Sequence, residues 1–466
     1  MTKRSPVSPA PGPLEDYARC FDGLFGARAQ RHSFRRYLEG LLLPAERNKT
    51  LTALANTEPV AGAQRKEAQS LQWFLSESRW DPQEELNECR LKLLLEEPTT
   101  AANDEGVLVI DEHGDRKWGK KTAHVGKQWL GNMGKTENGV VSVTSLWADE
   151  RIYWPCAYEP YTPSHHFEGG KYDPEFRTKL KIASQLVQKA VEGGIPFRAV
   201  VADPFYGEDE GFKHRLSELG VGYVVALKPS HAWWHRVGEI GSPWEAAVLA
   251  GQAWEDEHHP GDWVKVVRTF RDGHEEEWWA LEVDVGPYSP QRERRSVVAT
   301  TDPKVLPEKR TWYLATNLPH PDSDLLGTQS DLAPASVAEV VRLYGLRMWV
   351  EQSYKQVKHV LGWSDYQVRS DTAIRRHWQL VCCAFSFCWW AYGHLPTEEK
   401  AETGKTENDP FAADYSGGRG KKEGFSGVMA AGIESSEGVA GAICHAEKIL
   451  EGVLRDAPAI SAKTAA

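Results

Sequence analysis

Two short, largely apolar segments that are each followed by an aspartate constrain the fold most. Val107–Ile110 precedes Asp111, and Phe197–Ala202 precedes Asp203. Apolar runs of this length, without polar alternation, are typical of buried strands. The sequence therefore predicts a sheet in which two buried strands each end in a carboxylate.

The neighbouring segments complete a mixed α/β layer, since three strands, a helix, a strand, a helix and a strand follow one another. The predicted elements are strands at 140–146, 152–158 and 222–227, a helix at 174–191 capped by Asp173, and a helix near 209–219. Strands at 263–270, 277–285, 296–300 and 311–316 then follow, with Asp272-Gly273 as a hairpin turn.

The length of 466 residues predicts two or more domains. We predict a disordered tail at 1–13, a helical domain at 14–100, and the first part of an α/β core at 105–228. A β-rich insertion at 229–335, the second part of the core at 336–395, and a flexible linker with a C-terminal helical segment at 396–466 complete the chain.

The segment Tyr344–Lys358, predicted as one continuous helix, gathers its polar residues on one side. At 3.6 residues per turn they lie within an arc of about 80°; they are Tyr344, Arg347, Glu351, Lys355 and Lys358. One interpretation is a carboxylate that holds a metal beside cations that hold phosphates. The other is an ordinary solvated face with helical support between Glu351 and Lys355.

The net charge of −11 argues weakly against nucleic acid, but the distribution of charge matters more than the sum. Residues 116–135 hold six Lys and Arg, including Lys120 and Lys121, and no acidic residue. Residues 28–49 hold six basic residues, including Arg35 and Arg36, and two acidic ones. The seven cysteines show no paired spacing, which favours free thiols in a reducing cytoplasm over disulfides or zinc.

Three carboxylates brought together would repel one another unless a cation neutralised them. If Asp111, Asp203 and Glu351 converge, Mg²⁺ is the first candidate, because hard divalent ions prefer oxygen ligands. Two such ions can activate a nucleophile and stabilise the leaving oxygen of a phosphoryl displacement. An aspartate at the end of a strand is also common in structural positions, so neither aspartate is decisive alone.

The order of elements resembles the ribonuclease H-like catalytic domain of Asp-Asp-Glu transposases from bacterial insertion sequences. The spacing of Tyr344, Arg347, Glu351 and Lys358 resembles the Tyr-Arg-Glu-Lys signature of members with a β insertion before the last acid. Asp203-Pro-Phe-Tyr-Gly207 resembles the segment around their second aspartate, and Val109-Ile-Asp-Glu-His-Gly114 resembles the first. Members often have Asp and Ser or Thr where this chain has Glu112 and His113.

The resemblance implies an α/β, ribonuclease H-like mixed sheet with flanking helices, a β-rich insertion and an N-terminal helical DNA-binding domain. It implies that Asp111, Asp203 and Glu351 are catalytic and bind Mg²⁺, for which Mn²⁺ can substitute. The residues expected to contact double-stranded DNA are Tyr344, Arg347, Lys355, Lys358, Lys120, Lys121, Arg35 and Arg36. We expect cleavage at the element's ends, transfer of 3′ ends to target DNA, and a homodimer in the DNA complex, formed from a chain that can be monomeric when free.

Two other classes of function stay open on the sequence. One is a DNA-binding protein derived from a transposase that no longer cuts. The other is a carbohydrate-active hydrolase, suggested by the many tryptophans and acidic residues, although such an enzyme needs no row of cations beside Glu351.

Overall fold

The structure is a computed structural model that describes residues 6–10, 12–43, 48–55, 65–231, 233–235, 240–269, 275–283, 285–286, 295–306, 310–322 and 331–394. The chain divides into two compact units. The first takes in residues 1–101, 119–123 and 353–466, and the second takes in residues 102–118 and 124–352. The predicted turn Asp272-Gly273 and the predicted segment 396–466 lie outside the described residues.

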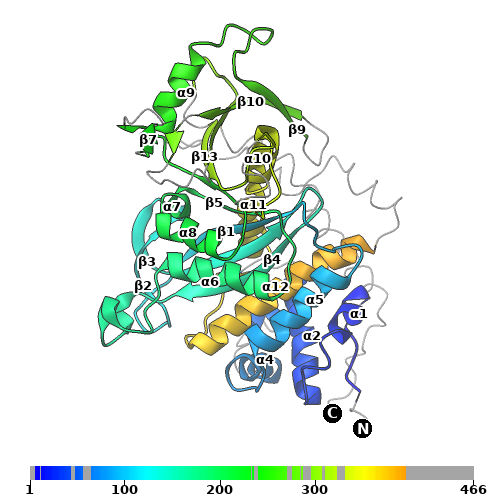
Figure 1. The fold of residues 1–466 in the computed structure, drawn as a ribbon. Coiled ribbons are helices and arrows are strands. Elements are labelled where there is room, and N and C mark those ends of the chain that lie inside the picture. Colours follow the sequence, from blue (N-terminus) through cyan, green and yellow to red (C-terminus); the bar gives the residue numbers. More distant parts are fainter. Residues whose placement is uncertain are drawn as a thin grey trace, which may run out of the picture. The chain divides into compact units, whose positions relative to one another are not determined.

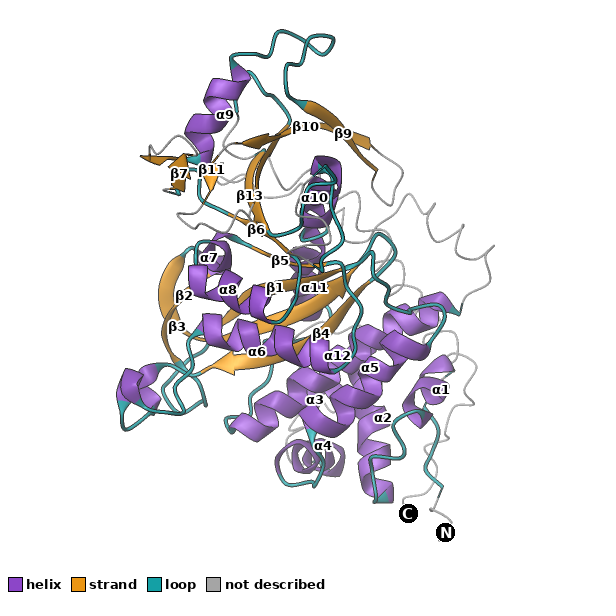
Figure 2. Cartoon of the chain, viewed as in Figure 1, coloured by secondary structure: helices purple, strands orange, loops and turns teal. Residues whose placement is uncertain are grey.

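The first unit is helical. Its elements are α1 (Pro13–Arg19), α2 (Arg28–Leu42), α3 (Leu51–Leu54), α4 (Lys66–Ser76), the π-helical turn η2 (Pro82–Leu86), α5 (Asn87–Glu96) and α12 (Asp371–Gly393). Helix α12 packs against α1, α2, α4 and α5 (Figure 2). The Asp81 side chain accepts from the amides of Gln83 and Glu84 and so caps the first turn of η2.

Buried hydrogen bonds join the early helices of this unit to α12, far away in the sequence. The Tyr37 hydroxyl lies 2.8 Å from Nδ1 of His377, and the Tyr17 hydroxyl donates to the carbonyl of Cys383 at 2.9 Å. Because both pairs are buried, loss of one partner would leave an unsatisfied polar group in the core. Within the described residues, no helix is long and apolar enough to cross a membrane.

The second unit is built on a ten-stranded mixed sheet with flanking helices (Figure 1). Strand order is β2-β3-β1-β5-β6-β13-β12-β10-β9, and β4 pairs with β3. The first six strands are β1 (Val107–Arg116), β2 (Gly126–Leu130), β3 (Lys135–Ala148), β4 (Tyr153–Tyr161), β5 (Ala199–Ala202) and β6 (Tyr223–Ala226). Pairs β1–β5 and β5–β6 are parallel, and the other pairs are antiparallel, which confirms the mixed α/β prediction.

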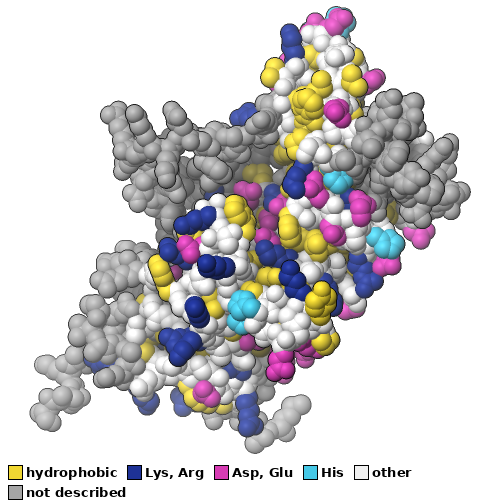
Figure 3. Space-filling view, turned by 90° about the vertical axis from the view of Figure 1, so that its left-hand side faces the viewer, with side chains coloured by type: hydrophobic (Ala, Val, Ile, Leu, Met, Phe, Trp, Pro, Cys, Tyr) yellow, Lys and Arg dark blue, Asp and Glu magenta, His cyan; other side chains and the backbone are white. Residues whose placement is uncertain are grey.

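The predicted strands of the insertion continue this same sheet. They are β9 (Val264–Thr269), β10 (Glu275–Val283), β12 (Arg295–Thr300) and β13 (Thr311–Thr316), and β13 pairs with β6. A small second sheet holds β7 (Trp233–His235), β8 (Ile240–Gly241) and β11 (Val285–Gly286). Helix α9 (Pro243–Gly251) exposes Trp244 and Leu249, and hydrophobic side chains are visible on this part of the insertion (Figure 3).

Two element boundaries differ from the prediction. Strand β1 does not end at Asp111 but runs to Arg116, because β3 pairs with it along its whole length. Helix α6 begins at Lys179 with Thr178 as its cap, not at Pro174. The Asp173 carboxylate instead accepts from the amides of Gly169 and Glu175 in a preceding turn.

The continuous helix predicted over 344–358 is wrong. Helix α10 (Val337–Gly345) ends at a glycine, and α11 (Met348–His359) begins three residues later. Amides of Arg347, Trp349 and Val350 bond to carbonyls three residues back, so the junction is a tight turn and not an α-helix. The arc expected for a single straight helix is therefore interrupted between Tyr344 and Glu351.

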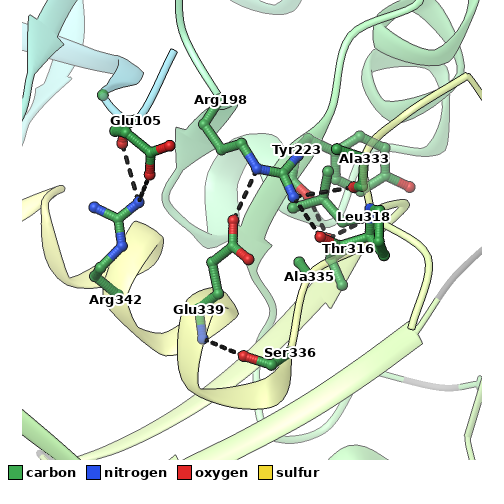
Figure 4. Close-up of polar contacts among 12 residues, drawn as sticks. Glu105, Arg198, Tyr223, Thr316, Leu318, Ala333, Ala335, Ser336, Glu339 and Arg342 are labelled. Atoms are coloured by element: carbon green, nitrogen blue, oxygen red, sulfur yellow. Dashed lines mark hydrogen bonds and ion pairs between the residues drawn. The ribbon is translucent and has the colours of Figure 1, made fainter. Parts of the chain in front are cut away.

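Arginine side chains fix α10 to the sheet (Figure 4). Arg198, just before β5, donates to Glu339 at 2.8 Å and to the carbonyls of Ala333 and Pro334. Arg342 donates to Glu150 at 2.8 Å and to the carbonyl of Glu105 at 3.1 Å. The strand that leads to Asp203 and the helix that leads to Arg347 are thereby joined directly.

Gly207 has a steric reason to be glycine. It closes the short helix α7 (Pro204–Gly207), where a Cβ would lie 1.9 Å from the carbonyl oxygen of Ala226 in β6. The close approach of α7 to β6 therefore explains this position of the Asp-Pro-Phe-Tyr-Gly motif.

Replacing Arg198 with alanine should lower the free energy of unfolding by about 2–3 kcal/mol, because Glu339 and two carbonyls lose their donor. Urea denaturation measures this change. The matched control is Arg215→Ala, whose exposed partner is Glu218 and whose loss should change little. Equal effects of the two substitutions would contradict the tethering role.

Gly207→Ala should cost at least about 2 kcal/mol of stability, since the new methyl group meets backbone that cannot rotate away. Thermal and urea unfolding measure the loss. Gly131→Ala, where a Cβ meets nothing within 4 Å, serves as the control and should stay close to the unmodified chain.

Candidate active site

The first two acids lie side by side because their strands are parallel neighbours. Ile110 of β1 is in register with Ala202 of β5. Asp111 and Asp203, which directly follow these two residues, therefore lie side by side. Neighbouring strands lie about 4.8 Å apart. Asp203 leaves the sheet at once and caps α7, accepting from the amide of Phe205 at 3.0 Å, whereas Asp111 stays within β1.

Arg347, in the turn between α10 and α11, lies between the first and third acids. Its Nη2 donates to Oδ2 of Asp111 at 2.8 Å, and its Nη1 lies 3.7 Å from Oε1 of Glu351. The Asp111 and Arg347 side chains are 11% and 18% exposed, whereas that of Glu351 is 61% exposed. The buried pair therefore fixes the turn, and Glu351 faces solvent one turn further along.

The ionisation of Asp111 depends on its burial and on its charged neighbours. Burial raises the pKa of Asp111 to about 7, and the neighbouring Asp203 carboxylate adds to this, although Arg347 acts in the opposite direction. Burial alone would lower the pKa of Arg347, but Asp111, Asp203 and Glu351 outweigh it and raise the pKa. Arg347 therefore opposes the effect of burial on the pKa of Asp111 without cancelling it.

Tyr344 is buried and packs edge-on against Trp312 of β13, with ring centroids 5.0 Å apart. Burial raises its pKa to about 12, and the three acids contribute to that rise. The phenol therefore belongs to the site's electrostatic surroundings, but its ring is enclosed by the insertion strands. The structure gives it a packing contact in place of the exposed position expected for binding a DNA backbone.

The residue after Asp111 is held by a lysine that the sequence analysis did not single out. Lys179, the first residue of α6, donates to Oε1 of Glu112 at 2.8 Å, and the Glu112 amide donates to Oδ1 of Asp111 at 2.7 Å. His113 is buried and lies 3.1 Å from Asp115. Glu112 and His113 therefore have partners of their own, and no sequence pattern pairs Lys179 with Glu112.

A metal position shared by all three acids is not formed in this conformation. Among the residues that the structure describes, no three His, Cys, Asp or Glu side chains are grouped closely enough to hold a metal ion. Asp111 and Glu351 meet around the Arg347 guanidinium instead. The donors fit a hard divalent cation chemically, since Asp111 and Asp203 are carboxylates on neighbouring strands.

The predicted DNA contacts lie in different surroundings. Lys120 and Lys121 are exposed in the segment 119–123, and Lys355 and Lys358 are half-buried on α11. Arg35 is buried and bonds to Glu15 and Asp22 at 2.8 and 2.7 Å, so the structure gives it a packing role in place of the predicted DNA contact. Arg36 pairs with Glu39 at 2.7 Å and is partly exposed.

Comparisons with known proteins identify the family of this chain. Residues 20–280 match the family described as DDE superfamily endonuclease, and residues 180–387 match the family described as transposase DDE domain. The chain is 32% identical over 369 residues to the probable transposase for insertion sequence element IS701 of Microchaete diplosiphon, covering 79% of this chain and 85% of the relative. The chain therefore belongs to the DDE superfamily of transposases.

Proposed function

We propose that this chain is an active DNA transposase of an insertion sequence, which cleaves phosphodiester bonds at the ends of the element and joins the freed 3′ ends to target DNA. The observation that supports this most directly is the register of β1 and β5, which sets Asp111 beside Asp203, with Arg347 bridging toward Glu351. We further infer that the mixed sheet is a ribonuclease H-like core, since it places the two aspartates on adjacent parallel strands.

Asp111, Asp203 and Glu351 would hold Mg²⁺, or Mn²⁺ in its place, and the bound metal would supply Lewis-acid activation of the attacking oxygen and stabilise the leaving oxygen. Without a metal, Arg347 pairs with Asp111, and this ion pair keeps the turn before Glu351 in place. Lys179 pairs with the Glu112 carboxylate, so Glu112 would not compete with Asp111 for the metal. The first nucleophile is water and the second is the 3′-hydroxyl.

Double-stranded DNA is the proposed partner. Lys120, Lys121, Lys355 and Lys358 are the proposed phosphate contacts, because they are lysines at exposed or half-buried positions. Because Arg347 is paired with Asp111, we propose that it contacts only a DNA phosphate that lies next to Asp111. An element has two ends that must be brought together, so we propose a homodimer in the DNA complex.

The burial of tryptophans bears on one of the two alternative functions, and an experiment separates the other from the proposed function. The interpretation as a carbohydrate-active hydrolase was suggested by the many tryptophans and acidic residues. Of these tryptophans, Trp263, Trp278 and Trp279 are buried in the insertion and are not exposed to bind a sugar. The reading as a DNA-binding protein that no longer cuts is separated from the proposed function by experiment, because both share the same DNA contacts.

Asp203→Asn should reduce Mg²⁺-dependent nicking of DNA carrying the element's ends by at least about a hundredfold, because one proposed ligand becomes a neutral amide. DNA affinity without metal should be retained. Gel-based nicking and fluorescence anisotropy measure the two quantities, with exposed Asp322→Asn as the control. An unmodified chain that binds these ends but never nicks them with Mg²⁺ or Mn²⁺ would instead support the non-cutting alternative.

In the absence of divalent metal, the unmodified chain should lose stability relative to Asp111→Asn as pH rises from about 5 to 8. The folded-state pKa of Asp111 is raised to about 7 from 3.8, so the folded chain binds more protons than the unfolded chain in between. Stability from the protonated group is therefore present at low pH and lost as pH passes the folded pKa. Urea unfolding across this range measures the difference; a gap between the two proteins that stays constant with pH would contradict it.

A further inference from the structure

The β2–β3 hairpin and the end of β1 carry an exposed group of cations and tryptophans outside the carboxylate site. We call this group the hairpin surface; it consists of Arg116, Trp118, Lys127, Trp129 and Lys135. Trp118 is 80% exposed and Trp129 is 56% exposed. All five residues belong to the second unit, and none of them has a role in the site described above.

The strand register places these residues on both faces of the hairpin. Arg116 is in register with Gly139 of β3, so it shares a face with Glu137 and Lys135, because side chains alternate along a strand. Lys127 and Trp129 lie on the other face of β2, whose burial alternates residue by residue. The register therefore places Arg116 and Lys135 on one face and Lys127 and Trp129 on the other, while Trp118 follows the end of β1.

The Arg116 guanidinium is stacked on an indole. Its Cζ lies 4.0 Å from the centroid of the Trp118 ring. Oε2 of Glu137 lies 3.8 Å from Nη2 of Arg116 and 3.5 Å from Nζ of Lys135, so this carboxylate lies between the two cations. The cation–π contact therefore places a positive charge over one face of the Trp118 ring and holds the two side chains together.

Protection of the sheet edge does not explain the whole surface. Strand β2 is an edge strand among those described, and a lysine on an edge strand discourages pairing with another sheet. That accounts for Lys127. It does not account for two large exposed aromatic rings, which would make such an edge more prone to association.

We propose that the hairpin surface is a second DNA-binding surface, which holds the sugar–phosphate backbone with its cations and contacts accessible sugar or base faces with Trp118 and Trp129. Cations interleaved with exposed aromatic rings match this ligand, since phosphates need positive charge and bases stack on rings. The proposal rests on the proposed function for the identity of the partner. The same chemistry is offered by a duplex and by an unpaired strand beside one.

The test uses the full chain, without divalent metal, and fluorescence anisotropy on two probes: a duplex of the element's end, and the same duplex with a single-stranded extension. The charge variant is Arg116→Ala with Lys127→Ala and Lys135→Ala. It should lower the slope of log affinity against log salt by about 2 to 3 on both probes, as expected for three lost phosphate contacts. The matched control removes three exposed lysines elsewhere in the same unit, Lys181, Lys189 and Lys304, and should keep the slope.

The aromatic variant, Trp118→Ala with Trp129→Ala, should weaken binding at least about fivefold. A loss confined to the extended probe would assign the rings to unpaired bases, and an equal loss on both probes would assign them to the duplex. Trp244→Ala, an exposed tryptophan of α9, is the control. Glu137→Gln should tighten binding, since it removes a negative charge between Arg116 and Lys135, and it supplies a gain that loss of folding cannot mimic.

Nicking separates this inference from the proposed function. If the unmodified chain binds and nicks DNA while the hairpin variants bind like it, the hairpin surface is not a DNA contact and the proposed function stands. If the unmodified chain neither binds nor nicks, both fall. If the lysine and tryptophan controls lose as much as the hairpin variants, binding is non-specific and the inference is overturned.

Discussion

Packing of like charges at the edge of one sheet is the constraint on which the second unit depends. Parallel pairing of β1 with β5 sets Asp111 next to Asp203, where burial makes an ionised carboxylate costly. Arg347 is the compensation that the chain itself provides, and it bonds to Asp111 at 2.8 Å. The insertion strands and α10 position Arg347 beside Asp111.

Arg347 arrives from far along the chain, so its position needs tethers. The insertion strands extend the sheet from β6 to β9, and α10 then packs back against β5 and β6. Arg198 fastens the start of α10 to the strand that leads to Asp203, while Trp312 of the insertion packs on Tyr344. The insertion is thus part of the scaffold of the site and not only an addition to it.

The chain belongs to the DDE superfamily. In its structure, the Arg347 guanidinium lies between the carboxylates of Asp111 and Glu351. Burial raises the pKa of Asp111 and the neighbouring Asp203 adds to the rise, whereas the contact with Arg347 lowers it. An ion pair and a metal are two ways to satisfy the same electrostatic demand.

The sequence by itself determined the features that follow from local patterns: the two apolar strands, the strands β3 and β4, the strands of the insertion, and the three candidate acids with their surrounding cations. These features depend on burial periodicity and residue type, which are visible along the chain. Only the tertiary structure decided that β1 continues past Asp111, that a turn at Arg347 interrupts the predicted helix, and that Arg35 is buried. Each of these depends on a partner distant in sequence or on a junction between elements, such as β3, Asp111 or Glu15, and local periodicity carries no information about such contacts.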